Sequence, residues 1–516
     1  MEIKNQKCPL TFSRRKFISA CAAGGACMLM APIAVESSVY TAKSVKLRLR
    51  VIYSLHKAVQ DRPDWPNVGF DFKPFIENTN SELKKHFPSF EFISTLASGQ
   101  KDAEEILNQD KIVKIDGYIV YQMNCWNRVV QTIAESKKPV LYVDFQYGGS
   151  GGFLVYNADF LNKKQSNVGF VSSSRIEDLI EAVKCFETSV NNLHSFSAAT
   201  TLARLKLTPV SKNISWKRDN LSILSLDETK KRLKESKILA IRDQTARPGE
   251  SVMDIPLEYL AFAEINQAWK SANKDEAKEI ANKWKKDSSK IVDVSIEELQ
   301  NSAAFYLGMK EVLKRHQANA ITINCLSGFY GNYIHAYPCM GFHELANEGL
   351  IGACECDISS TATMVAFTTM TQGRPGFISD PVIDTSKGQI IYAHCVASNR
   401  VFGPKGPKNK FNIMTHSEDR QGAAVQSILP TGFLTTTLRI DNARKEIIFH
   451  QAKAVDNDSN DRACRTKLCT EPIGDMEKLF TKWDKWGWHR VTFYGDLRQP
   501  VYDLADSIGW KVIEEA

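Results

Sequence analysis

From residue 46 onward, the chain alternates short apolar runs of strand type with longer amphipathic runs of helix type. The first strand-type runs are "LRVIYSL", "FEFIS", "GYIVYQ", "PVLYVDF" and "NVGFVS". Helices are expected between these runs at 73–86, 101–109 and 126–136. A further helix is expected after the last run, at 175–187. This alternation is typical of a parallel sheet with helices on both faces. The sequence therefore predicts a doubly wound, Rossmann-like α/β domain over residues 46–195.

The length of 516 residues suggests about three domains, at roughly 150 residues each. Residues 210–375 repeat the α/β pattern, with strands expected at "KILAIRD" and "ANAITINCL". From 376 to 516 consecutive β runs joined by turns indicate a β-rich barrel or sandwich. The predicted fold class is α/β, with two doubly wound Rossmann-like domains followed by a β-rich, barrel-like C-terminal domain.

A glycine-rich stretch, "QYGGSGGF" at 146–153, follows the strand-type run "VLYVDF". Doubly wound sheets bind ligands at such strand ends. The stretch lacks the GxGxxG spacing of a dinucleotide site. We expect a mobile loop beside the substrate.

The N-terminal segment is predicted to be a targeting signal. In "SRRKFISACAAGGACMLMAPIA" the pair Arg14 and Arg15 is followed by Phe17 and a weakly hydrophobic run, which resembles a twin-arginine export signal. Residues 1–42 are interpreted as signal peptide and linker, with cleavage between Ala34 and Ala42. We therefore expect contact with the twin-arginine export machinery and a periplasmic or otherwise exported location. An uncleaved membrane anchor stays open as the alternative.

The composition argues against nucleic acid as a partner. The net charge of +7 is small for this length, and no basic run is interleaved with aromatic residues. We expect no nucleic-acid binding.

Nine of the twelve cysteines follow the signal segment. Only Cys464 and Cys469, in the polar stretch "CRTKLC", suggest a local disulfide. We expect the other seven to be buried thiols that pack as small hydrophobic residues.

Acidic residues stand at the ends of two apolar, small-residue segments. "GLIGACE" is predicted to be a strand ending at Glu355, and "PGFISD" a strand ending at Asp380, with a buried helix between them. Carboxylates seldom enter such surroundings unless a metal, another charge or a helix end stabilises them. If both strands belong to one sheet, both acids reach its carboxyl edge. If a domain boundary falls at 372–376, both face the seam between domains.

Two histidines stand in apolar β segments, His394 in "IIYAHCV" and His489 in "WGWHRVTFYG". By pattern alone, each is more often a core residue than a ligand. Together with two carboxylates, however, they make a nitrogen and oxygen donor set suited to Mn²⁺ or Mg²⁺. His416 and His450 are weaker candidates.

Three motifs resemble the L-fucose isomerase and L-arabinose isomerase superfamily. They are "ACECD", "TQGRPGFISD" and the closing "HRVTFYGDLRQPVYDLADSIGWKVI". The resemblance implies a divalent metal, most often Mn²⁺, held by Glu355, Asp380 and His489. The arabinose isomerase branch adds His394. Trp488 takes the place of the first residue of that branch's histidine pair.

The resemblance also implies the roles of the site residues and the assembly. Glu355 and Asp380 would act as the catalytic acid/base pair as well as metal ligands. Asp357 would orient a ligand, and its alternative is a helix N-cap. His416 would lie behind the ligands or contact the substrate. The resemblance further implies a homo-oligomer with a small-molecule sugar as substrate.

The sequence thus favours an exported, metal-dependent sugar isomerase that works by aldose–ketose exchange through an enediolate. Two alternatives stay open. One is a non-catalytic sugar-binding relative of the same fold, and the other is a metal-dependent epimerase or lyase. The sequence does not identify the sugar.

Replacing both Arg14 and Arg15 with Lys should trap the precursor in the cytoplasm. The export receptor reads the guanidinium pair, and an ammonium group does not reproduce its planar donor geometry. Fractionation of cells that express the wild-type and double-Lys chains measures the effect. Normal export of the double-Lys chain would exclude a twin-arginine signal.

Overall fold

The structure is a computed structural model that describes residues 46–190, 195–210, 214–243 and 245–516. The N-terminal segment with the expected export signal lies outside these residues. In the part of the chain that is described, no helix combines the length and the apolar composition needed to cross a membrane.

The first sheet has five parallel strands in the order β2-β1-β3-β4-β5. The strands are β1 (Arg48–Ser54), β2 (Glu91–Ala97), β3 (Gly117–Gln122), β4 (Val140–Asp144) and β5 (Val168–Val171). The helices that alternate with them are α2 (Lys73–His86), α3 (Gln100–Val113), α4 (Val129–Ala134) and α6 (Ile176–Val190). β3 and β4 are buried along their whole length, as in a sheet covered on both faces. The Rossmann-like prediction for this sheet is confirmed.

The glycine-rich stretch differs from its prediction, because helix α5 (Ser150–Asn162) begins inside it. A side chain on Gly151 would place its Cβ 2.1 Å from the ring of Trp488. Glycine at this position therefore lets the first turn of α5 approach the tryptophan that precedes His489. The glycines serve close packing here rather than a free loop.

The second sheet has the order β11-β10-β6-β8-β7. Its strands are β6 (Ile238–Asp243), β7 (Arg247–Val252), β8 (Ile255–Ala261), β10 (Ala320–Ile323) and β11 (Ile351–Ala353). All neighbours are parallel except β7, which forms an antiparallel edge. The long helices of this part are α9 (Phe262–Ser271), α10 (Lys274–Asp287), α11 (Ile296–Arg315) and α13 (Cys339–Asn347). This sheet is also Rossmann-like, with one antiparallel strand added.

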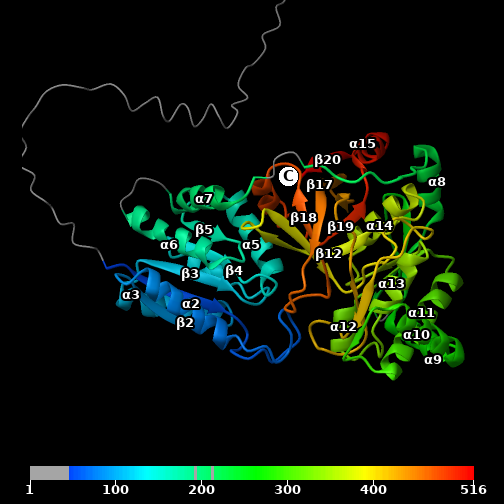
Figure 1. Ribbon diagram of the computed structural model, residues 1–516, viewed down its shortest axis with the longest axis horizontal. Coiled ribbons are helices and arrows are strands. Elements are labelled where there is room, and N and C mark those ends of the chain that lie inside the picture. Colours follow the sequence, from blue (N-terminus) through cyan, green and yellow to red (C-terminus); the bar gives the residue numbers. More distant parts are fainter. Residues whose placement is uncertain (1–45, 191–194, 211–213, 244) are drawn as a thin grey trace, which may run out of the picture. The chain divides into compact units, whose positions relative to one another are not determined.

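The third sheet closes into a barrel of six antiparallel strands. Its order is β16-β19-β12-β13-β18-β17, and β17 pairs again with β16. The strands are β12 (Phe377–Asp384), β13 (Gln389–His394), β16 (Leu434–Asp441), β17 (Glu446–Asn457), β18 (Thr466–Pro472) and β19 (Arg490–Tyr494). Figure 1 shows most of them together near the C-terminus, in yellow to red. Of the two predicted forms, the structure has the barrel, which leaves no free edge in the ring.

Further elements connect and cover these sheets. β20 (Lys511–Glu514) pairs in parallel with β17, while β9 (Ile291–Val292), β14 (Phe411–Met414) and β15 (Ala424–Ser427) form a small sheet. The remaining helices are α7 (Phe196–Leu207), α8 (Leu226–Glu235), α12 (Cys325–Tyr330), α14 (Ile358–Met370), α15 (Arg498–Ser507) and the 3₁₀ helix η2 (Met476–Thr481). The predicted closing order of strand, helix and strand is present as β19, α15 and β20.

The nine cysteines of the described residues all have free thiols and are buried. The expectation of buried thiols is confirmed. Cys464 and Cys469 do not form the local disulfide that their spacing suggested. Cys469 lies within β18, where an extended backbone carries the two residues apart.

A buried ion pair fixes the C-terminus to the barrel. Glu515 accepts a hydrogen bond from Arg490 Nε at 3.0 Å, and its other oxygen lies 2.9 Å from His450 Nδ1. The side chains of Arg490 and Glu515 have no exposed surface. Burial alone would raise the pKa of Glu515, but the charge of Arg490 outweighs it and lowers this pKa to about 2. The folded state therefore strongly favours the ionised carboxylate.

Replacing Glu515 with Gln should lower the free energy of unfolding at pH 7 by about 3 kcal/mol, because Arg490 stays buried without its counter-charge. A carboxyl group with a lowered pKa stabilises the fold above its unfolded pKa and loses that effect as the pH falls. Between about pH 4.5 and pH 2 the wild type should therefore lose this increment, and the Gln variant should not. Urea unfolding across this pH range measures both effects.

The matched control is Glu514→Gln. Glu514 is partly exposed and pairs with Arg498, so its loss should cost less than about 1 kcal/mol. Equal costs for the two variants would refute a special role for the buried pair.

Candidate metal centre

A strained turn positions Glu355. Strand β11 ends at Ala353, two residues earlier than predicted, and the chain then turns toward α14. Glu355 and Cys356 have φ angles of 61° and 53°, in the left-handed region that side chains other than glycine seldom adopt. The Cys356 N–H donates to the Ile323 carbonyl at 3.0 Å, at the end of β10. The turn is thus held over the carboxyl edge of the second sheet, and such strain is often found at functional sites.

Asp380 comes from the barrel. It lies in the middle of β12, so the prediction that it ends a strand was wrong. Because β11 and β12 belong to different sheets, the one-sheet arrangement is also wrong. The other arrangement fits, since the two acids meet where the second sheet adjoins the barrel. Asp380 is buried within its strand, where its carboxylate contacts protein side chains such as His489 instead of solvent.

The barrel brings two histidines to the same place. His394 is the last residue of β13, and His489 directly precedes β19. His489 Nε2 lies 2.9 Å from Asp380 Oδ1 and 3.5 Å from Glu355 Oε2. His394 Nε2 lies 3.8 Å from Glu355 Oε1. One donor atom from each of these four residues lies within 4.8 Å of the other three, and among the described residues this is the one such group of His, Cys, Asp or Glu.

Three of the four donor atoms make no hydrogen bond of normal geometry. Asp380 Oδ1, His394 Nε2 and His489 Nε2 are buried without one, although Asp380 Oδ1 and His489 Nε2 lie 2.9 Å apart, at ion-pair distance. Buried polar atoms are rarely left unsatisfied, because each costs free energy. Two carboxylates and two imidazoles that converge in this way fit a divalent cation such as Mn²⁺.

Asp357 supports the group from behind. Its side chain accepts a hydrogen bond from the Ser360 N–H at 3.0 Å, as the N-cap of α14. Asp357 Oδ2 lies 2.9 Å from His489 Nδ1 and 2.6 Å from Arg439 Nη1. The N-cap interpretation of Asp357 is therefore confirmed, and its contact with His489 Nδ1 is the one that the other interpretation requires. A carboxylate at Nδ1 orients the ring so that Nε2 faces Glu355 and Asp380.

The charges of the group stabilise one another. Burial would lower the pKa of His489, but Glu355 and Asp380 raise it well above its usual value. Burial would raise the pKa of Glu355, and the neighbouring His489 lowers it instead. Burial likewise opposes ionisation of Asp357, but Arg439 and His489 hold its pKa well below the usual range. Without a cation, the neighbouring carboxylates thus favour the protonated form of His489.

The two histidines differ in their ring hydrogen bonds. His489 Nδ1 faces a carboxylate, so when the ring gives up one proton the remaining proton stays on Nδ1 and Nε2 has a lone pair for a ligand bond. His394 Nδ1 instead accepts a hydrogen bond from the Cys395 N–H at 2.9 Å. That bond favours a proton on Nε2 of the neutral ring, so His394 can bind an ion through Nε2 only if this bond gives way and the proton moves to Nδ1. The geometry prepares His489 as a ligand better than His394.

His416 lies outside the four-residue group. Its Nδ1 is 3.2 Å from Asp419 Oδ1, and its ring packs against Phe329 and Tyr337. Burial would lower its pKa, but Asp419 raises it to about 9. The structure therefore places His416 in a separate ion pair.

Sequence reasoning missed the aromatic neighbours of the group and its arginine. Trp488 stacks on His489 with ring centroids 5.1 Å apart, and Trp126 meets Trp488 edge-on at 5.4 Å. Trp126 comes from the loop after β3 and is 48% exposed. The available signal was Trp488, which replaces a histidine of the resembled motif. Arg439 was visible only as a charge in the apolar stretch "TTTLRID".

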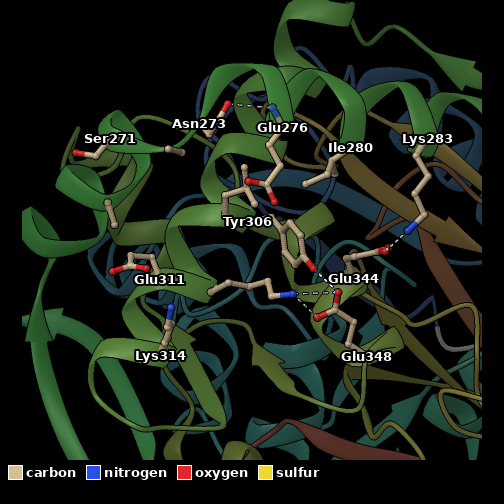
Figure 2. A pocket seen from close by; sticks show the side chains of 14 residues that line it. Ser271, Asn273, Glu276, Ile280, Lys283, Tyr306, Glu311, Lys314, Glu344 and Glu348 are labelled. Carbon is tan, nitrogen blue, oxygen red and sulfur yellow. Dashed lines mark hydrogen bonds and ion pairs between the residues drawn. The ribbon is translucent and has the colours of Figure 1, made fainter.

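A large pocket elsewhere does not compete as the reaction site. Figure 2 shows it, with a volume of about 780 Å³ and lining residues from α9, α10, α11 and α13. Two of its lysines are paired, since Lys283 contacts Glu344 and Lys310 contacts Glu348. No residue of the four-residue group lines it.

The comparisons with known proteins point to sugar isomerases. No protein-family profile matches the chain. The chain is similar to sulfoquinovose isomerases of Priestia aryabhattai and Priestia megaterium, at 22% identity over 209 residues, 39% of this chain. A sulfoquinovose isomerase of Alkalicoccus urumqiensis is 27% identical over 100 residues, 19% of this chain. The aligned parts span 45%, 45% and 22% of these relatives.

Solved structures give only distant likeness. A XylFII molecule is 10% identical with a TM-score of 0.16, covering 56% of this chain and 86% of its own. A solute-binding protein from Agrobacterium vitis, bound with alpha-D-tagatopyranose, is 9% identical with a TM-score of 0.17, covering 63% and 87%. These scores carry no argument. What the comparisons support is likeness to sugar isomerases, a coarser statement than membership of the superfamily that the motifs resemble.

Replacing Asp357 with Asn should separate its two roles. Asn caps a helix about as well as Asp, so α14 keeps its N-cap. Arg439 and His489 lose their charged acceptor, and the free energy of unfolding should fall by about 3 kcal/mol. Asp357→Ala should cost about 1 kcal/mol more, because it also removes the cap. Urea unfolding of the metal-free protein measures both, and an Asn variant as stable as the wild type would contradict the role of the charge.

Proposed function

We propose that this protein is a metal-dependent sugar isomerase that interconverts an aldose and a ketose. The observation that carries the proposal is the convergence of Glu355, Asp380, His394 and His489, with three buried donor atoms that make no hydrogen bond of normal geometry. The similarity to sulfoquinovose isomerases supports the same reaction class.

We propose Glu355, Asp380 and His489 as the principal ligands of the ion, with His394 as the fourth. Mn²⁺ is the preferred ion, because it accepts carboxylate oxygen together with imidazole nitrogen. When bound, such a cation polarises the sugar oxygens and stabilises the negative charge that develops on them. Asp357 keeps His489 in the tautomer that this role requires.

The carboxylates supply the proton transfer in this proposal. Isomerisation moves a proton from the carbon beside the carbonyl to the former carbonyl carbon, while a hydroxyl proton passes between the two oxygens. The reaction therefore needs no oxidant or reductant. Glu355 is the better placed base, since its side chain is 20% exposed and that of Asp380 is 4% exposed. One carboxylate can take the proton from carbon and return it.

The substrate to assay first and the location of the protein are also proposals. Sulfoquinovose is the first sugar to assay, because the relatives' names state it. The pair Arg14 and Arg15 supports export through the twin-arginine machinery, and hence action outside the cytoplasm. That route carries folded proteins, which suits a chain whose proposed ligands come from the edge of the second sheet and from the barrel.

The purified wild type, loaded with Mn²⁺, should hold about one ion per chain and isomerise at least one sugar. Glu355→Gln and Asp380→Asn should each lose most bound metal and reduce kcat by about 100-fold or more. Elemental analysis and a panel of pentoses, hexoses and sulfoquinovose test both points. Full metal content in both variants would overturn the assignment.

The other outcomes identify the alternatives. Bound metal and bound sugar without turnover would indicate a sugar-binding relative. A product that differs only in the configuration of one carbon would indicate an epimerase.

Replacing His489 with Gln should abolish most of the rise in melting temperature that Mn²⁺ gives the wild type. A ligand that binds only the folded state stabilises it according to its affinity, so a lost ligand atom shrinks the increment. His394→Gln should shrink it less, because His394 Nδ1 already accepts a hydrogen bond. Melting curves with and without Mn²⁺ compare the two.

The matched control is His450→Gln. His450 is a buried histidine of the same barrel that contacts Tyr392 and Glu515 and lies outside the four-residue group. Its loss should lower the melting temperature of the metal-free protein and leave the Mn²⁺ increment unchanged. A His489 variant that behaves like this control would remove His489 from the ligands.

A further inference from the structure

A buried lysine shares a face of the barrel with Asp380. In the ladder Asp380 pairs with Ala393, and Ala393 pairs with Lys467 on the next strand. Side chains of directly paired residues in an antiparallel sheet point to the same face. Neighbouring pairs are about 5 Å apart, so Lys467 begins about 10 Å from Asp380. Only the methyl group of Ala393 comes between them in this row.

The ammonium of Lys467 has no carboxylate partner. The residue is 2% exposed, and its Nζ lies 5.7 Å from the centroid of the Tyr147 ring. No ion pair joins it to any acid of the described residues at the usual limit of 4.0 Å. Burial lowers its pKa, as expected for an ammonium that is poorly compensated. Buried lysines are rare without a partner, which suggests that the partner is a ligand.

A neighbouring acid, Asp458, is already engaged. Its N–H donates to the Lys467 carbonyl at 3.2 Å, directly after the end of β17. Its carboxylate accepts from the Tyr147 hydroxyl at 2.7 Å and lies 3.8 Å from Lys387 Nζ. Asp458 thus compensates Lys467 only from a distance.

Arg462 is a second cation in this part of the structure, near Tyr147 and Asp458. The Arg462 guanidinium stacks over the Phe145 ring at 4.6 Å, and its Nε contacts Asn460 Oδ1 at 3.4 Å. Arg462 lines a cavity of about 290 Å³ together with Tyr147 and Asp458. Burial lowers its pKa as well, and no ion pair joins it to a carboxylate in the described ranges. The buried Lys467 ammonium and the half-buried Arg462 guanidinium therefore both lie near Tyr147.

We propose that Lys467, assisted by Arg462, binds an anionic group on the substrate, at the end of the sugar remote from the reacting carbons. The proposal rests on the proposed isomerase function and narrows its substrate class to sugars that carry a sulfonate, phosphate or carboxylate. The row from Asp380 to Lys467 then orients the sugar, with the reacting carbons at the four-residue group and the anion at the lysine. Lys467 is a specificity-determining residue in this arrangement.

The test uses the full, Mn²⁺-loaded chain with three probes that differ at one end: sulfoquinovose, glucose 6-phosphate and glucose. Calorimetry gives the affinity of each, and turnover assays give kcat and KM. The wild type should prefer one anionic sugar to glucose, and the comparison of the first two identifies the anion. Lys467→Met should weaken the affinity for the preferred anionic sugar by about 30-fold or more, mainly as a rise in KM. The affinity for glucose should fall by less than about 3-fold. Lys467→Arg keeps the charge and should recover most of the loss.

Two controls keep the test decisive. Lys453→Met changes a lysine of the neighbouring strand β17. Lys453 lies opposite Glu471 in the ladder, and its replacement should alter the affinity for neither sugar. If Lys467→Met does not fold, Arg462→Met provides the same comparison with a smaller expected loss. An equal loss for glucose and the anionic sugar, or no preference in the wild type, would overturn the proposal.

The result also separates this proposal from the isomerase proposal. Lys467-dependent binding of an anionic sugar without turnover would reject the isomerase function and keep the anion site. Isomerisation of neutral and anionic sugars at equal kcat/KM would keep the isomerase function and reject the anion site.

Discussion

The carboxylate of Asp357 joins the parts of the chain on which the four-residue group depends. It caps α14, which leaves the second sheet, and it contacts Arg439 of β16 and His489 before β19. The helix end and the barrel are therefore fixed to one side chain. A buried charge with three partners of this kind stabilises only if all three are present, because each missing one exposes a desolvation cost. The position of His489 relative to Glu355 follows from that constraint.

Much of the fold could be predicted from the chain itself. Strands β1, β3, β4 and β5 are buried on both faces, so they are visible as apolar runs between helical ones. The hairpin of β7 and β8 was missed because β7, "RPGESV", is a largely exposed edge strand without an apolar pattern. Closure of the barrel was also beyond local pattern. The pairing of β19 with β16 and with β12 depends on contacts between distant segments.

The candidate site, too, could be predicted only in part from the sequence. Glu355, Asp380, His394 and His489 could be named from acids and histidines in apolar segments and from the resemblance of their motifs. Their meeting point could not, because it depends on the left-handed turn at Glu355 and Cys356 and on two different sheets. Local propensity does not predict left-handed backbone at a glutamate. Lys467 has no local signal either, since only the ladder shows that it shares a face with Asp380.

The first sheet contributes to the same centre through packing rather than through ligands. Gly151 at the start of α5 admits the ring of Trp488, and Trp488 stacks on His489. Trp126, from the loop after β3, also packs against Trp488 in an edge-to-face contact. Tyr147, just before α5, lies between Lys467 and the cavity that Arg462 lines. The tryptophan that departs from the resembled histidine pair thus makes one imidazole rigid instead of adding a second. In the proposed function, a centre with one fixed histidine and a distant cation would hold a sugar at both ends, which would tie the selection of the substrate to residues outside the proposed metal ligands.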